Sequence, residues 1–138
     1  MQAAIDAFCE KTGQTAPSSD AEYIRCIFES LAMRYNEVLG MLSSMAPFPI
    51  RTLHVIGGGS KNKLLNQFTA NAIGMPVVAG PSEATAIGNG LVQAKAMGLV
   101  ESRWEMRKLI AASVEMETFL PEEIDRWKKA YETYQSII

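Results

Sequence analysis

The residues best placed for chemistry in this 138-residue chain are three consecutive glycines, Gly57, Gly58 and Gly59. They follow a short β-rich run at 52–56 and precede a segment with helical spacing. Glycine lets the backbone approach a ligand without a Cβ in the way, and the amino end of a helix offers free N–H groups. The turn therefore predicts a site for an anionic group of the kind that nucleotides carry. From the glycines alone, a tight turn that binds nothing is the alternative.

The charge pattern around the turn favours the binding interpretation. No acidic residue occurs from Val38 through Ser82, although the chain has 15 of them, and Arg51, Lys61 and Lys63 lie inside this window. A local excess of positive charge attracts anions. The same window offers no carboxylate to act as a general base or to hold Mg²⁺. We therefore assign no catalytic residue and no metal ligand to the chain, and expect the chemistry to come from elsewhere.

The composition and motifs of the sequence exclude several other classes of protein. A dinucleotide-binding G-x-G-x-x-G would need glycine at Asn62, and no G-x-x-x-x-G-K-[ST] loop occurs. The net charge of −2 is unlike the strongly basic face of nucleic-acid-binding proteins. Two cysteines and one histidine cannot supply four zinc ligands. The sequence shows no membrane span and no secretory signal, so we expect a cytoplasmic protein with reduced thiols.

Two helices are predicted before the glycine turn. The first spans 2–12 and ends at Gly13. The second starts at a capping box of Ser19 and Glu22 and closes before Pro47. If the two helices pack antiparallel, the two cysteines that they carry lie close together. The second helix has one apolar face, formed by Ile24, Ile27, Phe28, Leu31, Tyr35, Val38, Leu39 and Leu42.

The turn itself belongs to a strand–helix–strand–helix segment. The run 52–56 is the first predicted strand, and a helix that ends at Gly74 connects it to a second strand at 76–79. Ser82 is predicted to cap the next helix, which runs to Met97. This order is a βαβα unit, so the fold class is α/β with two parallel strands.

The rest of the chain supplies packing elements. Segment 102–138 is predicted to form two further helices, with Trp104 and Trp127 in the core. Gly88 and Gly90 each cost their helix about 1 kcal/mol relative to alanine, which favours close packing against a neighbour or a ligand. Two parallel strands do not complete an α/β domain, because such a sheet is normally covered on both faces. We therefore expect the chain to be part of a larger domain.

Residues 53–67 carry a more specific signal. The run LHVIGGGSKNKLLNQ resembles the adenosine-binding motif of the FGGY carbohydrate kinases, members of the actin/hsp70/sugar-kinase superfamily. Segments 22–32 and 78–89 are similar to the helix before that motif and to the strand and helix after it. The resemblance implies that residues 1–138 are the C-terminal portion of the second, ATP-binding domain, which has the actin-like (ribonuclease H-like) ATPase fold. The sugar-binding domain, the Asp-x-Gly-Thr phosphate loop and the Asp general base of the family have no counterpart here.

The resemblance also implies roles for individual residues. Gly57, Gly58 and Gly59 would face the adenosine and α-phosphate of ATP, and Asn62 would lie near the adenine or ribose. In the parent enzyme ATP and Mg²⁺ would be the cofactors, with Mg²⁺ held mainly by parts missing here, and the γ-phosphate would pass to the 1-hydroxyl of L-rhamnulose. L-fuculose or xylulose as the sugar, and a non-enzymatic nucleotide-binding module, remain alternatives. The chain alone is expected to be inactive.

Overall fold

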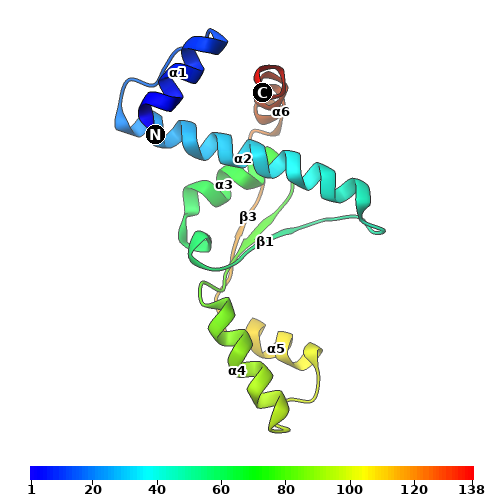
Figure 1. The fold of residues 1–138 in the computed structure, drawn as a ribbon. Helices are drawn as coiled ribbons and strands as arrows, with labels where there is room; N and C mark the ends of the chain where they lie inside the picture. Colours follow the sequence, from blue (N-terminus) through cyan, green and yellow to red (C-terminus); the bar gives the residue numbers. More distant parts are fainter.

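The computed structural model describes all residues from Met1 to Ile138 and is built around a small sheet with helices above and below it (Figure 1). No helix is both long enough and apolar enough to cross a membrane. The elements in chain order are α1 (Gln2–Thr12), α2 (Asp20–Met45), β1 (Leu53–Val55), the 3₁₀ helix η1 (Gly58–Lys61), α3 (Lys63–Ile73), β2 (Val77–Ala79), α4 (Ala84–Ala96), α5 (Arg103–Ser113), β3 (Glu117–Phe119) and α6 (Ile124–Ile137).

The sheet has three strands in the order β1-β2-β3. β1 and β2 are parallel, with Leu53 opposite Val77, so the predicted βαβα unit is confirmed. β3 runs antiparallel to β2, with Phe119 opposite Val77. This strand differs from the prediction for segment 102–138, which contained only helices. The strand has three residues, of which Phe119 alone is buried, so it carries almost none of the alternation that identifies a strand.

Helix α3 is the centre of the core, because it contacts the sheet, α2 and α6. One cluster of buried side chains joins α2 and α3 to β2 and β3 and consists of Leu39, Ala70, Ile73, Val77, Ala79 and Phe119. A second joins α2, α3 and α6 and consists of Ala32, Met33, Ala72 and Trp127. The small residues at these contacts let α2 and α3 approach each other closely.

The N-terminal helices begin and end at the predicted residues. Gly13 has a φ of 68° and ends α1 in the left-handed conformation. The Ser19 side chain accepts a hydrogen bond from the Glu22 N–H, as a capping box requires. The reciprocal bond differs from the prediction: the Glu22 carboxylate accepts from the N–H and Oγ of Ser18, one residue earlier. Those two bonds stabilise the carboxylate and lower the pKa of Glu22.

Helices α1 and α2 are linked by a hydrogen bond and share an apolar hollow. The Tyr23 hydroxyl donates to the Asp6 carboxylate, and this bond raises the pKa of Tyr23 to about 12. Cys9 and Cys26 are free thiols that line the same hollow, which agrees with the prediction that the two cysteines lie close together. Burial raises the pKa of Cys26.

The apolar face of α2 is mostly exposed, and the burial predicted for Trp104 was wrong. The residues of α2 that are buried are Ala32, Met33 and Leu39, while five of the eight residues of the apolar face are exposed: Ile24, Leu31, Tyr35, Val38 and Leu42. Ala32, Met33 and Leu39 are the side chains of α2 that belong to the two core clusters, and most of its other apolar side chains face outward. Trp127 is only 6% exposed, as predicted, whereas Trp104 is 70% exposed.

Helices α4 and α5, residues 84–113, form an arm that projects from the sheet on the side away from α2 (Figure 1). The remaining elements are called the body. Neither arm helix contains a buried residue. A Cβ at Gly88 or Gly90 would meet no atom within 4 Å, so the close packing predicted for them is not supplied by this chain. Ser82 does not cap α4 either: Glu83 occupies the N-cap position and its side chain makes no capping bond.

Candidate functional site

The glycine turn lies at the edge of the sheet where β1 and β2 both end. Because these strands are parallel, the loops that follow them are neighbours. The Gly57 N–H donates to the Pro81 carbonyl at 3.0 Å, and the Gly80 N–H donates to the Val55 carbonyl at 2.8 Å. These two bonds fasten the glycine turn to the loop that leads into the arm.

The three glycines of the turn are not equivalent. Gly57 has φ 77° and ψ −163°, a conformation that is essentially restricted to glycine. Gly58 and Gly59 have ordinary φ values, and a Cβ on either would meet no atom within 4 Å. Neither of their N–H groups donates a hydrogen bond within the chain. The chain itself therefore explains the glycine at 57, whereas 58 and 59 present an open surface with two free donors.

Asn62 has a structural role that sequence analysis did not assign. Its Oδ1 accepts from the Leu65 N–H at 3.0 Å, so the side chain caps α3. Its Nδ2 donates no hydrogen bond within the chain. Asn66 stabilises the preceding helix η1: its side chain is buried, and its Nδ2 donates to the Ser60 carbonyl at 2.9 Å. Asn62 thus orients α3 and still offers a donor beside the turn.

A polar cleft of about 670 Å³ lies next to the turn. Lys61 and Lys63 line it, whereas Arg51, the third cation of the acid-free window, does not. Gly80 lies on its floor with φ 116°, and a Cβ there would approach the Glu115 carbonyl to 3.4 Å. The full lining is Ser60, Lys61, Lys63, Ala79, Gly80, Ser82, Glu115, Met116 and Glu117.

The cleft is not free of carboxylates, and this corrects the electrostatic prediction. β3 places Glu117 opposite Ala79, and the segment before it adds Glu115 to the same cleft. Lys63 Nζ and Glu117 Oε1 form an ion pair at 2.9 Å. No acidic residue occurs from Val38 through Ser82 in the sequence, but the fold places Glu115 and Glu117 next to residues of this window. Glu115 and Glu117 were not predicted to lie in the cleft because β3 was not predicted. The one signal for this strand in the sequence is Thr118-Phe119, two residue types that favour strands, shortly before Pro121.

The residues of the cleft do not fit a Mg²⁺ centre. A magnesium site in a protein is built from oxygen ligands, usually with at least one carboxylate free to bind the ion. Nowhere in the chain do three His, Cys, Asp or Glu side chains gather as ligands of one ion. Of the two carboxylates in the cleft, Glu117 is already paired with Lys63.

The sequence places the chain in a known family, and its fold agrees with that placement. The profile of the FGGY family of carbohydrate kinases, C-terminal domain, matches residues 1–97, and the chain belongs to this family. The computed structure also matches two solved sugar or polyol kinases of the actin-like ATPase fold. These are xylulose kinase from Rhodospirillum rubrum (TM-score 0.68, 19% identity, 91% of this chain and 26% of that one) and Plasmodium falciparum glycerol kinase with ADP (TM-score 0.68, 22% identity, 90% and 25%).

Curated relatives narrow the similarity further. The chain is 52% identical to a rhamnulokinase from Bacteroides thetaiotaomicron over 138 residues, which is 100% of this chain and 28% of that protein. It is 40% identical to a rhamnulokinase from Klebsiella pneumoniae subsp. pneumoniae over 139 positions, covering 99% and 28%. The chain thus spans little more than a quarter of the length of these relatives.

Proposed function

We propose that the chain is the adenosine-binding part of a sugar kinase that transfers the γ-phosphate of ATP to the 1-hydroxyl of L-rhamnulose. The observation that carries this proposal is the open glycine surface: Gly58 and Gly59 have free N–H groups and no neighbour that requires glycine. Backbone that lacks a Cβ and has unpaired donors suits close contact with a nucleotide. The rhamnulokinase names of the similar proteins support L-rhamnulose as the sugar.

In this proposal the chain binds and orients the nucleotide. Gly57 shapes the turn, Gly58 and Gly59 lie against the adenosine and α-phosphate, and the free Nδ2 of Asn62 donates to the adenine or ribose. Lys61 lines the adjoining cleft and adds positive charge for the phosphates.

The catalytic groups of the proposed kinase lie outside these 138 residues. We propose that residues 1–138 are the C-terminal portion of the second domain, and that the sugar site and the general base belong to other parts of the parent. Mg²⁺ held there would neutralise charge on the phosphates during in-line transfer. The short coverage of the relatives supports this division.

The nucleotide part of the proposal is tested by titrating the chain with ADP in a calorimeter. Gly58→Val would place a branched side chain on the open surface, and we expect ADP binding at least about tenfold weaker, because the ligand loses its contact with the backbone. Gly40→Val is the matched control, since Gly40 is also exposed with no atom within 4 Å of a Cβ but lies on α2, outside the turn. Equal affinity for all three proteins would contradict the proposal.

The sugar is tested on the longer parent protein with ATP and a panel of L-rhamnulose, L-fuculose and xylulose. We expect fastest phosphorylation of L-rhamnulose, at its 1-hydroxyl, and no phosphorylation of any sugar by the 138-residue chain alone. Preference for another sugar would replace L-rhamnulose but keep the kinase. ADP binding without phosphorylation of any sugar by the parent would support the non-enzymatic nucleotide-binding module instead.

A further inference from the structure

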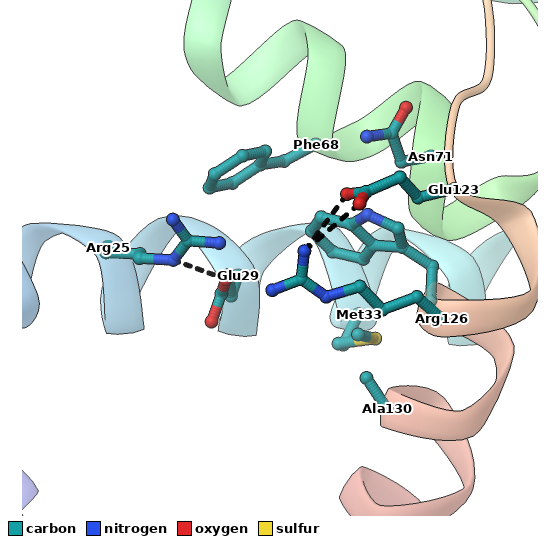
Figure 2. Close-up of a pocket in the computed structure, with 9 residues that line it drawn as sticks. Arg25, Glu29, Met33, Phe68, Asn71, Glu123, Arg126 and Ala130 are labelled. Carbon is teal, nitrogen blue, oxygen red and sulfur yellow. Dashed lines mark hydrogen bonds and ion pairs between the residues drawn. The ribbon is translucent and has the colours of Figure 1, made fainter.

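A second hollow lies between α2, α3 and α6, away from the glycine turn (Figure 2). Its volume is about 200 Å³, equivalent to roughly seven water molecules. Asn71 lines it nine residues after Asn62, which is about 14 Å along α3. None of the residues of the polar cleft takes part. The lining residues are Arg25, Glu29, Met33, Phe68, Asn71, Glu123, Arg126, Trp127 and Ala130.

One side of this hollow is aromatic. The rings of Phe68 and Trp127 lie with their centroids 5.2 Å apart and their planes tilted by 53°. The Arg25 guanidinium lies 5.4 Å from the centroid of the Phe68 ring, within the range of a cation–π contact. A flat apolar group can therefore find both ring surface and a stacked cation here.

Two buried side chains of the hollow have hydrogen-bond donors without acceptors. Asn71 is 6% exposed, and its Oδ1 already accepts from Gln67 Nε2 and from the Glu122 N–H, both at 2.8 Å. Its Nδ2 donates to nothing in the chain, and Figure 2 shows this nitrogen turned toward the side where Phe68 lies. The Nε1 of Trp127, also 6% exposed, donates to nothing either. Neither nitrogen is sealed from solvent, since no fully enclosed polar side-chain atom lacks a partner.

The charged groups at the rim add further donors. Arg25 Nε donates to Glu29 at 2.8 Å, and Arg126 Nη1 pairs with Glu123 at 3.1 Å (Figure 2). A guanidinium has five N–H donors, so each arginine keeps donors in reserve, and each of the two carboxylates has an arginine as its ion-pair partner. The unpartnered nitrogens of Asn71 and Trp127 are donors, so a ligand that fits them supplies acceptors.

We propose that this hollow is a binding site for a small aromatic carboxylate, separate from the nucleotide site. The ring of the ligand packs against Phe68 and Trp127, and its carboxylate accepts from Asn71 Nδ2, the Trp127 indole and the spare donors of Arg126. The site lies on the body, on residues that the proposed nucleotide contacts do not use. Binding here is therefore independent of whether the glycine turn binds ADP.

The test is an NMR titration of the ¹⁵N-labelled full chain with benzoate. We expect saturable shifts of the Trp127 indole N–H and the Asn71 side-chain NH₂. The indole of Trp104, which lies on the arm, serves as an internal reference that does not move. Cyclohexanecarboxylate lacks the ring face and benzyl alcohol lacks the anionic acceptor, and we expect each to bind at least about tenfold more weakly. Equal binding of either compound overturns the corresponding part of the proposal.

Three variants test whether benzoate binds specifically to these side chains. Asn71→Asp keeps the oxygen that accepts from Glu122 and Gln67 but replaces the free donor with an acceptor, so benzoate binding should be lost. Arg126→Gln changes an exposed side chain, leaves the fold intact and should weaken binding about tenfold, which keeps the test decisive if Asn71→Asp does not fold. Arg107→Gln removes a guanidinium 5.0 Å from the Trp104 ring on the arm and should change nothing.

Two results would overturn the proposal. One is a titration in which the Trp127 and Trp104 indoles shift together without saturating. The other is wild-type affinity for benzoate in Arg126→Gln and in any folded Asn71→Asp protein.

Discussion

The body and the arm are both helical and both carry apolar side chains, but the arm buries only Val100, in the turn between its two helices. Val77 and Ala70 in the body are fully enclosed, whereas Val92, Leu99 and Trp104 in the arm are more than half exposed. Isolated helices of 11 to 13 residues are marginal in water, and their stability in proteins comes mainly from packing. The comparison shows that the arm has the sequence of a packed element without its partner. Four experiments break or sharpen this contrast.

The two tryptophans give the largest expected difference. Trp127→Ala empties a packed position between α2, α3 and α6 and should lower the free energy of unfolding by about 3–5 kcal/mol. Trp104→Ala removes an exposed ring and its contact with Arg107, so the loss should stay below about 1 kcal/mol. Urea unfolding followed by circular dichroism measures both. Similar losses in the two variants would show that the arm is packed in solution.

The two glycines of α4 come next. A Cβ at Gly88 or Gly90 meets nothing in this chain, so each change to alanine should stabilise the helix by about 1 kcal/mol. Amide hydrogen exchange in α4 should slow accordingly. In the longer parent a variant with both Gly88→Ala and Gly90→Ala should lose activity if another element packs closely on this face. Unchanged exchange in the chain would mean that α4 already has a partner.

The body and the arm each contain a helix capped by a side-chain oxygen, so the loss of one capping bond can be compared between the two regions. Asn62 caps α3 in the body and Ser102 caps α5 in the arm, each by accepting one backbone N–H. Either change to alanine costs about 1 kcal/mol locally. Asn62→Ala should lower the global unfolding free energy by that amount, whereas Ser102→Ala should only speed amide exchange in α5. A global loss in Ser102→Ala would argue that arm and body unfold together.

The smallest effect concerns the pH dependence of the hydrogen bond between α1 and α2, within the body. The pKa of Tyr23 is raised from 10.0 to about 12 by its bond to Asp6, so this bond stabilises the folded chain fully below pH 10. Its contribution is lost as the pH rises through about 12. The difference in tyrosinate absorbance between wild type and Tyr23→Phe should report this late titration. Asp6→Asn should lower it toward pH 10, because the hydrogen bond to the carboxylate is the largest cause of the shift, and a titration near pH 10 in the wild type would refute the bond.

Sequence signals that act over a few residues were the dependable ones. Gly13 and Gly74 adopt the left-handed conformation that ends a helix, and the Ser19 cap forms as expected, because each depends on its own turn of chain. The glycine turn after β1 was predicted for the same reason. Its Gly57 conformation and its position beside the β2 loop agree with a strand–turn–helix unit.

Burial and proximity were harder to predict, because they depend on segments far along the chain or outside it. β3 is held by pairing with β2 and by Phe119 in the core, about 40 residues away from its partner in sequence. Without it, Glu117 could not be placed beside Lys63. The exposed apolar side chains of α2 and the arm have the spacing of a buried helix face. This spacing does not identify the element that covers the face.

The unequal glycines at the sheet edge also have a consequence for sequence variation. Gly57 and Gly80 have positive φ values, and Gly80 is additionally crowded by the Glu115 carbonyl, so the backbone itself holds these positions as glycine. Gly58 and Gly59 are constrained only by what approaches them from outside. A lineage that abandoned the ligand would be free to replace 58 and 59 while 57 and 80 persisted. The four positions would then record separately the history of the fold and the history of its binding function.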